Sequence, residues 1–290
     1  MSRARATATG SVAVALWSLL AVLTVWSTPV PPLLLNALCF AIGGCIGMVW
    51  VWRNGEMGRL RQIPLQVYLF GTAGLFGYHF LYFSALRAAP PAQAGLIAYL
   101  WPLLIVLFSG LLPGEHLRRG HILGACLGFA GAAMIVARGG GAFDPAALPG
   151  YGLAFLCALT WSIYSVGSRR LGDTPTAAVA VFCLATAALS LLAHFAFETT
   201  VWPTSFHGWL AIIGLGSGPV GLAFYVWDIG VKRGDIQLLG TISYSAPLLS
   251  TLVLIAVGIA APSPILLIAA CLIVAGAGLA ARASARGRFD

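Results

Sequence analysis

Hydrophobic residues occupy this chain in long runs separated by short polar segments. Ten runs approach the length of about 20 apolar residues that a helix needs to cross a bilayer. The expected spans are residues 10–27, 31–52, 64–86, 91–112, 121–137, 150–169, 174–197, 207–231, 236–257 and 263–281. Several intervening segments are so short that neighbouring helices must run antiparallel. The pattern predicts an all-α, polytopic membrane protein with ten transmembrane helices.

Composition supports this prediction. Hydrophobic residues make up 60% of the chain and charged residues 8%, with a mean hydropathy of +0.93, whereas charged residues make up about a quarter of a soluble domain. The basic start before the first run also resembles a signal peptide. No soluble domain follows it, so we expect a retained first span.

The 16 Lys and Arg residues lie in alternate loops. Fourteen fall at the two termini and in the loops on the same side, and only Arg87 and Arg138 fall on the other side. The positive-inside rule therefore places both termini in the cytoplasm. Because the basic residues act as topological anchors, their excess does not indicate a nucleic-acid partner.

The two halves of the chain resemble each other at an offset of about 145 residues. Tyr99 and Pro102 correspond to Tyr244 and Pro247, and the string Ala-Cys-Leu recurs at 125–127 and 270–272. The pattern predicts two five-helix repeats, residues 1–144 and 145–290. Since five is odd, the second repeat must be inverted in the membrane, an arrangement typical of alternating-access carriers.

Pro102 and Pro247 each lie within a membrane-length run. A proline inside a helix removes one backbone hydrogen bond and crowds the carbonyl four residues back, here that of Ala98 or Ser243. Matched interruptions in two halves point to a transporter's substrate site. We therefore expect Pro102 and Pro247 to be hinges beside a central cavity.

The candidate substrate contacts are aromatic and hydroxyl side chains in the third, fourth, sixth and ninth runs. They are Tyr78, His79, Tyr82, Tyr99, Trp101, Trp161, Ser243, Tyr244 and Ser245. The alternative for the hydroxyl residues is ordinary packing or satisfaction of the broken backbone. An aromatic wall facing a hydroxyl wall suits an amino acid.

Ionisable groups inside the runs are few, and each is a functional candidate by default. His79 can bond a substrate or relay a proton, or it can bond a neighbouring helix. Asp228 lies four residues before Lys232, which favours an ion pair at the membrane interface. Glu115 lies close to Arg118 and Arg119, and we expect an exposed pairing in that loop.

Several functional classes lack their residues. The chain has no Gly-x-Ser-x-Gly, no paired carboxylates and no His/Cys/Asp ligand cluster, so we expect no catalytic residue, no metal and no enzyme activity. It has no phosphate-binding loop for ATP, and no cofactor is expected. No Lys or Arg lies near the midplane, which disfavours a dianionic substrate. A neutral or zwitterionic small molecule remains.

These residues resemble the drug/metabolite transporter superfamily in its ten-helix form of two EamA-type repeats. The string Pro102, Gly114-Glu115, Gly124 and Gly131 is similar to the end of such a repeat, although Ala260 stands where the second repeat would have the glutamate. Tyr99-Leu-Trp-Pro102 and Ser243-Tyr-Ser-Ala-Pro247 resemble the YddG-type aromatic amino acid exporters. The resemblance implies export of amino acids across the inner membrane through a cavity between the halves.

The sequence thus favours an amino acid exporter that works by alternating access, in lipid, as a monomer or weak oligomer. An exporter of drugs or other metabolites on the same fold is the first alternative. A membrane enzyme or a non-transporting subunit is the second. Facilitated diffusion and a proton route through His79 are both open.

Overall fold

The computed structural model describes residues 1–137 and 144–286, and within these ranges the chain forms helices and no strand. The α-helices are α1 (Arg3–Trp17), α2 (Leu20–Trp26), α3 (Pro32–Arg53), α4 (Met57–Leu60), α5 (Leu65–Ala88), α6 (Pro91–Ala98), α7 (Trp101–Ser109), α8 (Arg119–Val136), α9 (Leu148–Arg170), α10 (Ala178–Phe197), α11 (Phe206–Ser217), α12 (Ala223–Arg233), α13 (Ile236–Ile242), α14 (Ser245–Ala256) and α15 (Ile265–Arg286). A 3₁₀ turn at Pro145–Ala147 precedes α9, and a π-helical turn at Gly218–Leu222 joins α11 to α12. Arg138 and Arg288, two of the counted basic residues, lie outside the described residues.

The helices account for ten spans. Nine helical stretches of the described residues are long and apolar enough to cross a membrane. The tenth is α5, whose 24 residues rise about 36 Å at 1.5 Å each, more than the roughly 30 Å hydrocarbon core. Its hydropathy is lower because Tyr78, His79 and Tyr82 lie within it. The all-α, ten-span prediction is confirmed.

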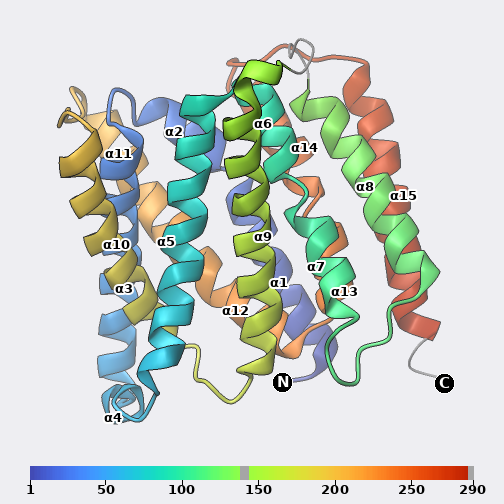
Figure 1. Cartoon of the computed structure of the whole chain (residues 1–290), viewed down its shortest axis with the longest axis horizontal. Coiled ribbons are helices and arrows are strands. Elements are labelled where there is room, and N and C mark those ends of the chain that lie inside the picture. The colour runs from blue at the N-terminus through green and yellow to red at the C-terminus, as the bar shows by residue number, and fades with distance from the viewer. Residues whose placement is uncertain (138–143, 287–290) are drawn as a thin grey trace.

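The spans run up and down between two faces of the molecule (Figure 1). The start of α1, the short helix α4 and the end of α15 lie at one face, which we call the termini face. The other we call the opposite face. The first span of the first half begins at the termini face, whereas α9, the first span of the second half, begins at the opposite face. The two halves are therefore inverted relative to each other.

The most extensive helix contacts all join one half of the chain to the other. These pairs are α8 with α15, α3 with α10, α5 with α9, and α1 with α12. The first two pairs join corresponding spans of the two halves. The last two pairs correspond to each other, because each joins the third span of one half to the first span of the other half. The halves therefore share their packing, and neither has a separate core.

Small residues allow the closest of these contacts. A Cβ atom added to Gly124 of α8 would lie 2.5 Å from the carbonyl oxygen of Gly276 in α15, and one added to Gly276 would lie 2.4 Å from that of Gly124. Such approach of two backbones is how membrane helices gain van der Waals contact without a hydrophobic driving force between them.

The fourth and ninth spans are broken at corresponding places. The fourth span is interrupted between Ala98 and Trp101, and the ninth between Ile242 and Ser245. Pro102 and Pro247 lie in the first turns of α7 and α14, where a missing N–H costs little. The carbonyl of Ser243 accepts the N–H of Ala246 at 3.1 Å, so this carbonyl keeps a partner.

Two further interruptions have no counterpart in the other half. The first span breaks after Trp17, and the eighth contains the π-helical turn at Gly218–Leu222. The indole Nε1 of Trp17 donates to the carbonyl of Pro219 at 3.1 Å and so joins the two interruptions. Such π-helical turns often occur at functional sites. The sequence pattern did not predict this pair.

Large apolar side chains also cover the outside of the helices. Examples are Leu192, Phe195, Leu267 and Val274, each more than 60% exposed. A soluble monomer rarely shows such extended apolar surface, whereas a bilayer solvates it. The exposed face of these helices is therefore the lipid face.

Candidate functional site

Six large aromatic side chains from five spans meet between the two halves, and we call them the aromatic cluster. Its members are Trp17, Tyr78, Trp101, Trp161, Phe224 and Trp227. Neighbouring rings in it have centroids 5.1 to 6.5 Å apart, mostly edge-to-face or tilted. These are the separations and angles at which aromatic pairs attract one another.

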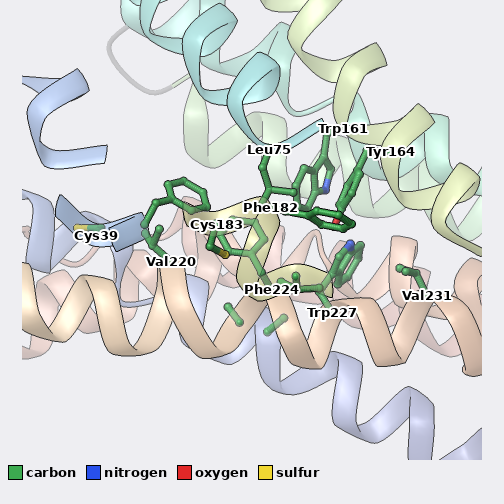
Figure 2. Close-up of a cluster of buried hydrophobic side chains, with 14 of the residues drawn as sticks. Cys39, Leu75, Trp161, Tyr164, Phe182, Cys183, Val220, Phe224, Trp227 and Val231 are labelled. Atoms are coloured by element: carbon green, nitrogen blue, oxygen red, sulfur yellow. The ribbon is translucent and has the colours of Figure 1, made fainter. Parts of the chain in front are cut away.

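Trp161 lies at the centre of the aromatic cluster. Figure 2 shows Trp161 and Tyr164 of α9 facing Phe224 and Trp227 of α12. The indole Nε1 of Trp227 donates to the hydroxyl of Ser165 at 3.1 Å. Burying an indole requires such a partner for its N–H, so this bond fixes the orientation of the Trp227 ring.

The third span brings two tyrosines to one edge of the aromatic cluster. The rings of Tyr78 and Tyr82 are stacked, with centroids 6.2 Å apart and an interplanar angle of 7°, as their i, i+4 spacing allows. Tyr78 also lies 5.1 Å from Trp161. Tyr99 stands at the break of the fourth span, close to both phenols. The break and the two stacked tyrosines are therefore neighbours.

Close packing of α5 against α9 makes this arrangement possible. A Cβ atom at Gly74 would lie 2.4 Å from the ring of Tyr164. The absence of a side chain at that position lets α9 approach α5. The approach places Trp161 against Tyr78, which lies one turn further along α5.

His79 of α5 lies at a second edge of the aromatic cluster, where α5 meets α3 and α12. Its ring meets Phe40 edge-on at 5.0 Å and Phe224 at 6.1 Å. Its Nδ1 lies 2.8 Å from the carbonyl oxygen of Leu75. Because a carbonyl only accepts, Nδ1 carries the proton in this bond, and Nε2 is the nitrogen that can bond a substrate or take up a second proton.

The candidate residues of the ninth span lie elsewhere. Tyr244 is fully buried in a second apolar cluster with α8 and α15. Its ring meets Phe129 at 6.0 Å, and its hydroxyl accepts the N–H of Leu103 at 2.9 Å. The hydroxyls of Ser243 and Ser245 donate to carbonyls of their own span, at Leu239 and Ile242.

The structure thus divides the nine candidates. Those of the third, fourth and sixth spans come together in or beside the aromatic cluster: Tyr78, His79, Tyr82, Tyr99, Trp101 and Trp161. In the described part of the chain, the contacts of Ser243, Tyr244 and Ser245 lie with their own span, α7, α8 and α15 instead. Their role as substrate contacts stays a prediction.

Sequence reasoning did not include three members of the aromatic cluster among the candidates. Trp17 ends α1 at an interruption. Phe224, Trp227 and Val231 of α12 follow Val220 of the preceding π-helical turn in one buried set. The spacing of four, three and four along this stretch is the helical signal that identifies a buried face. That signal was present in the sequence, but it does not distinguish a packed core from a site.

A network of charged side chains holds the termini face together. The carboxylate of Glu115, in the loop before α8, pairs with Arg3 at 3.0 Å and with Arg169 of α9. Arg169 also donates to the carbonyls of Val231 and Gly234, and Arg3 lies 3.8 Å from Asp235. The side chain of Glu115 is only 5% exposed.

The expected exposed pairing of Glu115 within its own loop is therefore wrong. Sequence proximity favoured Arg118 and Arg119, but Arg3 and Arg169 come from segments far away in the chain. Only the packing of α1 and α9 beside this loop brings them to the carboxylate.

A second network lies at the opposite face around Glu198. Its carboxylate accepts the backbone N–H groups of Leu33 and Leu34 at the start of α3, at 3.1 and 3.3 Å. It also pairs with Arg87 and lies 2.9 Å from Nδ1 of His194. An anion at a helix N-terminus satisfies free N–H groups and the helix dipole.

The predicted ion pair of Asp228 is confirmed. Its carboxylate lies 2.9 Å from Nζ of Lys232, one turn away, and accepts the hydroxyl of Thr176 at 2.7 Å. Lys232 also donates to the carbonyl of Thr174. The pair joins α12 to the segment that precedes α10.

Comparison with known proteins identifies the pattern of two repeats. The model of the EamA-like transporter family matches this chain twice, over residues 6–137 and 148–282. The two matches have nearly the same length and together cover most of the chain. They account for the repeat at an offset of about 145 residues.

Individual relatives cover nearly the whole chain. An aromatic amino acid exporter YddG of Ancylobacter novellus is 57% identical over 283 residues, which are 97% of this chain and 98% of the relative. The aromatic amino acid exporter YddG of Escherichia coli is 27% identical over 90% of this chain and 91% of its own length. A crystal structure with 55% sequence identity superposes with a TM-score of 0.92 over 96% of this chain and 98% of its own.

Proposed function

The chain belongs to the EamA-like transporter family, and on this premise we propose that it exports aromatic and other amino acids by alternating access. As a member of a transporter family it is not an enzyme. The observation that carries the proposal is the aromatic cluster, to which both halves of the chain contribute and which lies beside the break of the fourth span.

The chemistry of the aromatic cluster favours substrates with an aromatic or apolar side chain. Stacked and edge-to-face contacts with several rings stabilise another ring by about 0.5–1.5 kcal/mol each. Tyr78, Tyr82 and Tyr99 add phenol groups, and Nε2 of His79 adds a hydrogen-bonding nitrogen, to this apolar surface. They provide donors and acceptors for the ammonium and carboxylate of an amino acid. The names of the two exporters support the same substrate class.

The site of transport in this proposal is a central cavity that forms when the cluster opens. Its contacts are Tyr78, His79, Tyr82, Tyr99, Trp101 and Trp161, and Ser243, Tyr244 and Ser245 join them from the ninth span. Pro102 and Pro247 act as hinges, since each stands at a helix break that is already present. The two repeats, residues 1–144 and 145–290, exchange conformations about these breaks.

The orientation follows from the charges. The start of α1, the end of α15 and helix α4 lie at the termini face, and fourteen of the 16 basic residues fall on that side of the expected topology. We therefore assign this face to the cytoplasm and the membrane to the inner membrane. The protein acts there as a monomer or weak oligomer, without a nucleic-acid partner.

The Glu115 network is the inner gate in this scheme. It joins the start of α1, the loop before α8, the end of α9 and the connection before α13, so it ties both halves together at the cytoplasmic face. Uptake of a substrate from the cytoplasm requires these segments to separate. The network thus stabilises the state that is closed toward the cytoplasm.

Reconstituted protein tests the proposal. Proteoliposomes loaded with labelled L-phenylalanine, L-tryptophan, L-alanine or an organic cation are diluted into unlabelled buffer, with and without a pH gradient. We expect efflux of the amino acids and competition among them. Efflux of the cation alone would favour a drug exporter on the same fold. A dependence on the pH gradient that is lost in His79→Gln would assign proton coupling to that residue.

A further inference from the structure

A cavity of about 120 Å³ lies at the opposite face, apart from the aromatic cluster. It is bounded by the start of α3, the second half of α5 and the end of α10. Its lining residues are Leu33, Phe80, Phe83, Ser84, Arg87 and Phe197. In the proposed orientation this is the outer end of the molecule, where an exported substrate leaves.

The walls of the cavity are aromatic. Phe80 of α5 and Phe197 of α10 face each other with ring centroids 6.1 Å apart, and Phe83 lies one turn from Phe80. An apolar cavity of about 150 Å³ holds a benzene molecule. At about 120 Å³ the cavity here is close to that size, so a single aromatic ring would fill it and the polar part of a ligand would lie at its mouth.

Polar groups stand at one end of these walls. Ser84 and Arg87 are three residues apart on α5, so both side chains project from the same face of that helix. Glu198 pairs with the guanidinium of Arg87 and is itself held by two N–H groups of α3 and by His194. The anchored carboxylate orients the guanidinium. A guanidinium carries five N–H donors and binds a carboxylate through two of them.

The cavity adjoins the proposed central site through one ring. The ring of Phe83 lines the cavity and lies 6.3 Å from that of His79 and 6.0 Å from that of Tyr82. Tyr82 in turn stacks on Tyr78 at the edge of the aromatic cluster. A change of rotamer at Phe83 would connect the two compartments.

We propose that this cavity is an outer binding site that receives an aromatic amino acid from the central site before its release. The ring lies among Phe80, Phe83 and Phe197, the carboxylate binds Arg87, and the ammonium donates to the hydroxyl of Ser84. The inference rests on the proposed function, because it takes the exported amino acid as the ligand. It adds a second compartment, with Phe83 as the partition between the two.

Exchange measured from the outer side tests the site. Proteoliposomes loaded with labelled L-phenylalanine receive unlabelled L-phenylalanine outside, and the external concentration that gives half-maximal exchange is recorded. Ser84→Leu fills the cavity without touching the Arg87–Glu198 pair. Phe197→Ala removes one wall at an exposed position. We expect each to raise that concentration about tenfold, the equivalent of one charge-assisted hydrogen bond or aromatic contact.

Two comparisons make the result specific. Arg87→Lys keeps the charge opposite Glu198 but loses the planar guanidinium. It should therefore weaken the binding of external L-phenylalanine. 2-Phenylethylamine lacks the carboxylate, so the concentration at which it inhibits exchange by half should be the same in Arg87→Lys as in the wild type. Phe195→Ala is the matched control, because Phe195 is an exposed phenylalanine of the same helix that does not line the cavity.

The outcomes separate the two proposals. If Ser84→Leu and Phe197→Ala exchange with the same half-maximal concentration as the wild type, the outer site is overturned and the export function stands. Loss of a copurifying phospholipid from Ser84→Leu, seen by mass spectrometry together with unchanged exchange, would assign the cavity to lipid and also overturn it. Absence of exchange in the wild-type protein would instead contradict the export function itself.

Discussion

The hydroxyl of Tyr244 accepts the backbone N–H of Leu103 at 2.9 Å. Tyr244 stands at the break of the ninth span, and Leu103 lies in the first turn of α7, just after the break of the fourth. The first N–H groups of a helix have no partner within it. One half of the chain therefore satisfies the helix end that the break in the other half exposes.

This bond leads to a prediction for Tyr244→Phe. The ring remains, but a buried N–H loses its acceptor, which costs about 1–3 kcal/mol. We expect a lower unfolding temperature in detergent and slower L-phenylalanine efflux from proteoliposomes. Tyr68→Phe is the control, because the Tyr68 hydroxyl also bonds a backbone group, donating to the carbonyl of Leu60, but far from the breaks. Equal efflux by the two variants would contradict a role of this bond in transport.

Removal of side chains beside the aromatic cluster should impair transport and not folding. His79→Ala and Tyr99→Ala each take away a half-buried group, and we expect normal amounts in the membrane with strongly reduced efflux. Tyr78→Phe keeps the stacked ring and should retain more activity than Tyr78→Ala. Full transport by both His79→Ala and Tyr99→Ala in proteoliposomes would refute the assignment of this site.

Loss of the Glu115 network should open the termini face. Glu115 is buried but its partner Arg3 is 42% exposed, so solvent screening lowers the cost of removing the carboxylate to about 1–2 kcal/mol. This corresponds to a factor of roughly 10 in the closed population. The test uses a chain whose six cysteines are replaced and which carries one cysteine at the buried position 112. Glu115→Gln should speed its labelling by an impermeant thiol reagent applied at the termini face.

The matched control for that experiment is Glu56→Gln. Glu56 lies at the same face and pairs with Arg59 at 3.2 Å, but this pair is more exposed, and surface pairs contribute about 0–1 kcal/mol. Labelling that rises equally in both variants would show a general charge effect and not the opening of a gate.

The contact between α8 and α15 should tolerate no added carbon atom. Gly124→Ala places a Cβ atom only 2.5 Å from the carbonyl oxygen of Gly276, so the helices must separate. We expect a marked fall in unfolding temperature and in the amount of folded protein. Gly278→Ala, in α15 but with no atom within 4 Å of the new Cβ, should behave as the wild type. Similar stability of both variants would contradict the packing described.

The aromatic candidates illustrate how far sequence reasoning reached. Tyr78 and Tyr82 were identified because they share a helical face, and the structure stacks them. Ser243 and Ser245 were chosen because they flank Tyr244 beside the break, yet their hydroxyls bond their own span. Periodicity tells which residues share a face. It does not tell whether a hydroxyl there is already satisfied by a carbonyl one turn away.

The sequence by itself determined the number of spans, their alternation and the inverted repeat. These follow from properties that are local along the chain: the length of apolar runs, the loops that carry Lys and Arg, and the recurrence of Tyr and Pro at one offset. A bilayer permits few solutions for such a pattern, since every backbone polar group in it must be bonded internally.

Only the tertiary structure decided which side chains meet. The partners of Glu115 lie more than 50 residues away, and the indole of Trp17 bonds a carbonyl at Pro219. Phe83, which lines the outer cavity, meets the rings of His79 and Tyr82. Such contacts depend on how closely pairs of helices approach and at what rotation, which glycines such as Gly74 and Gly124 determine. No pattern within one span contains that information, because it belongs to the packing between spans.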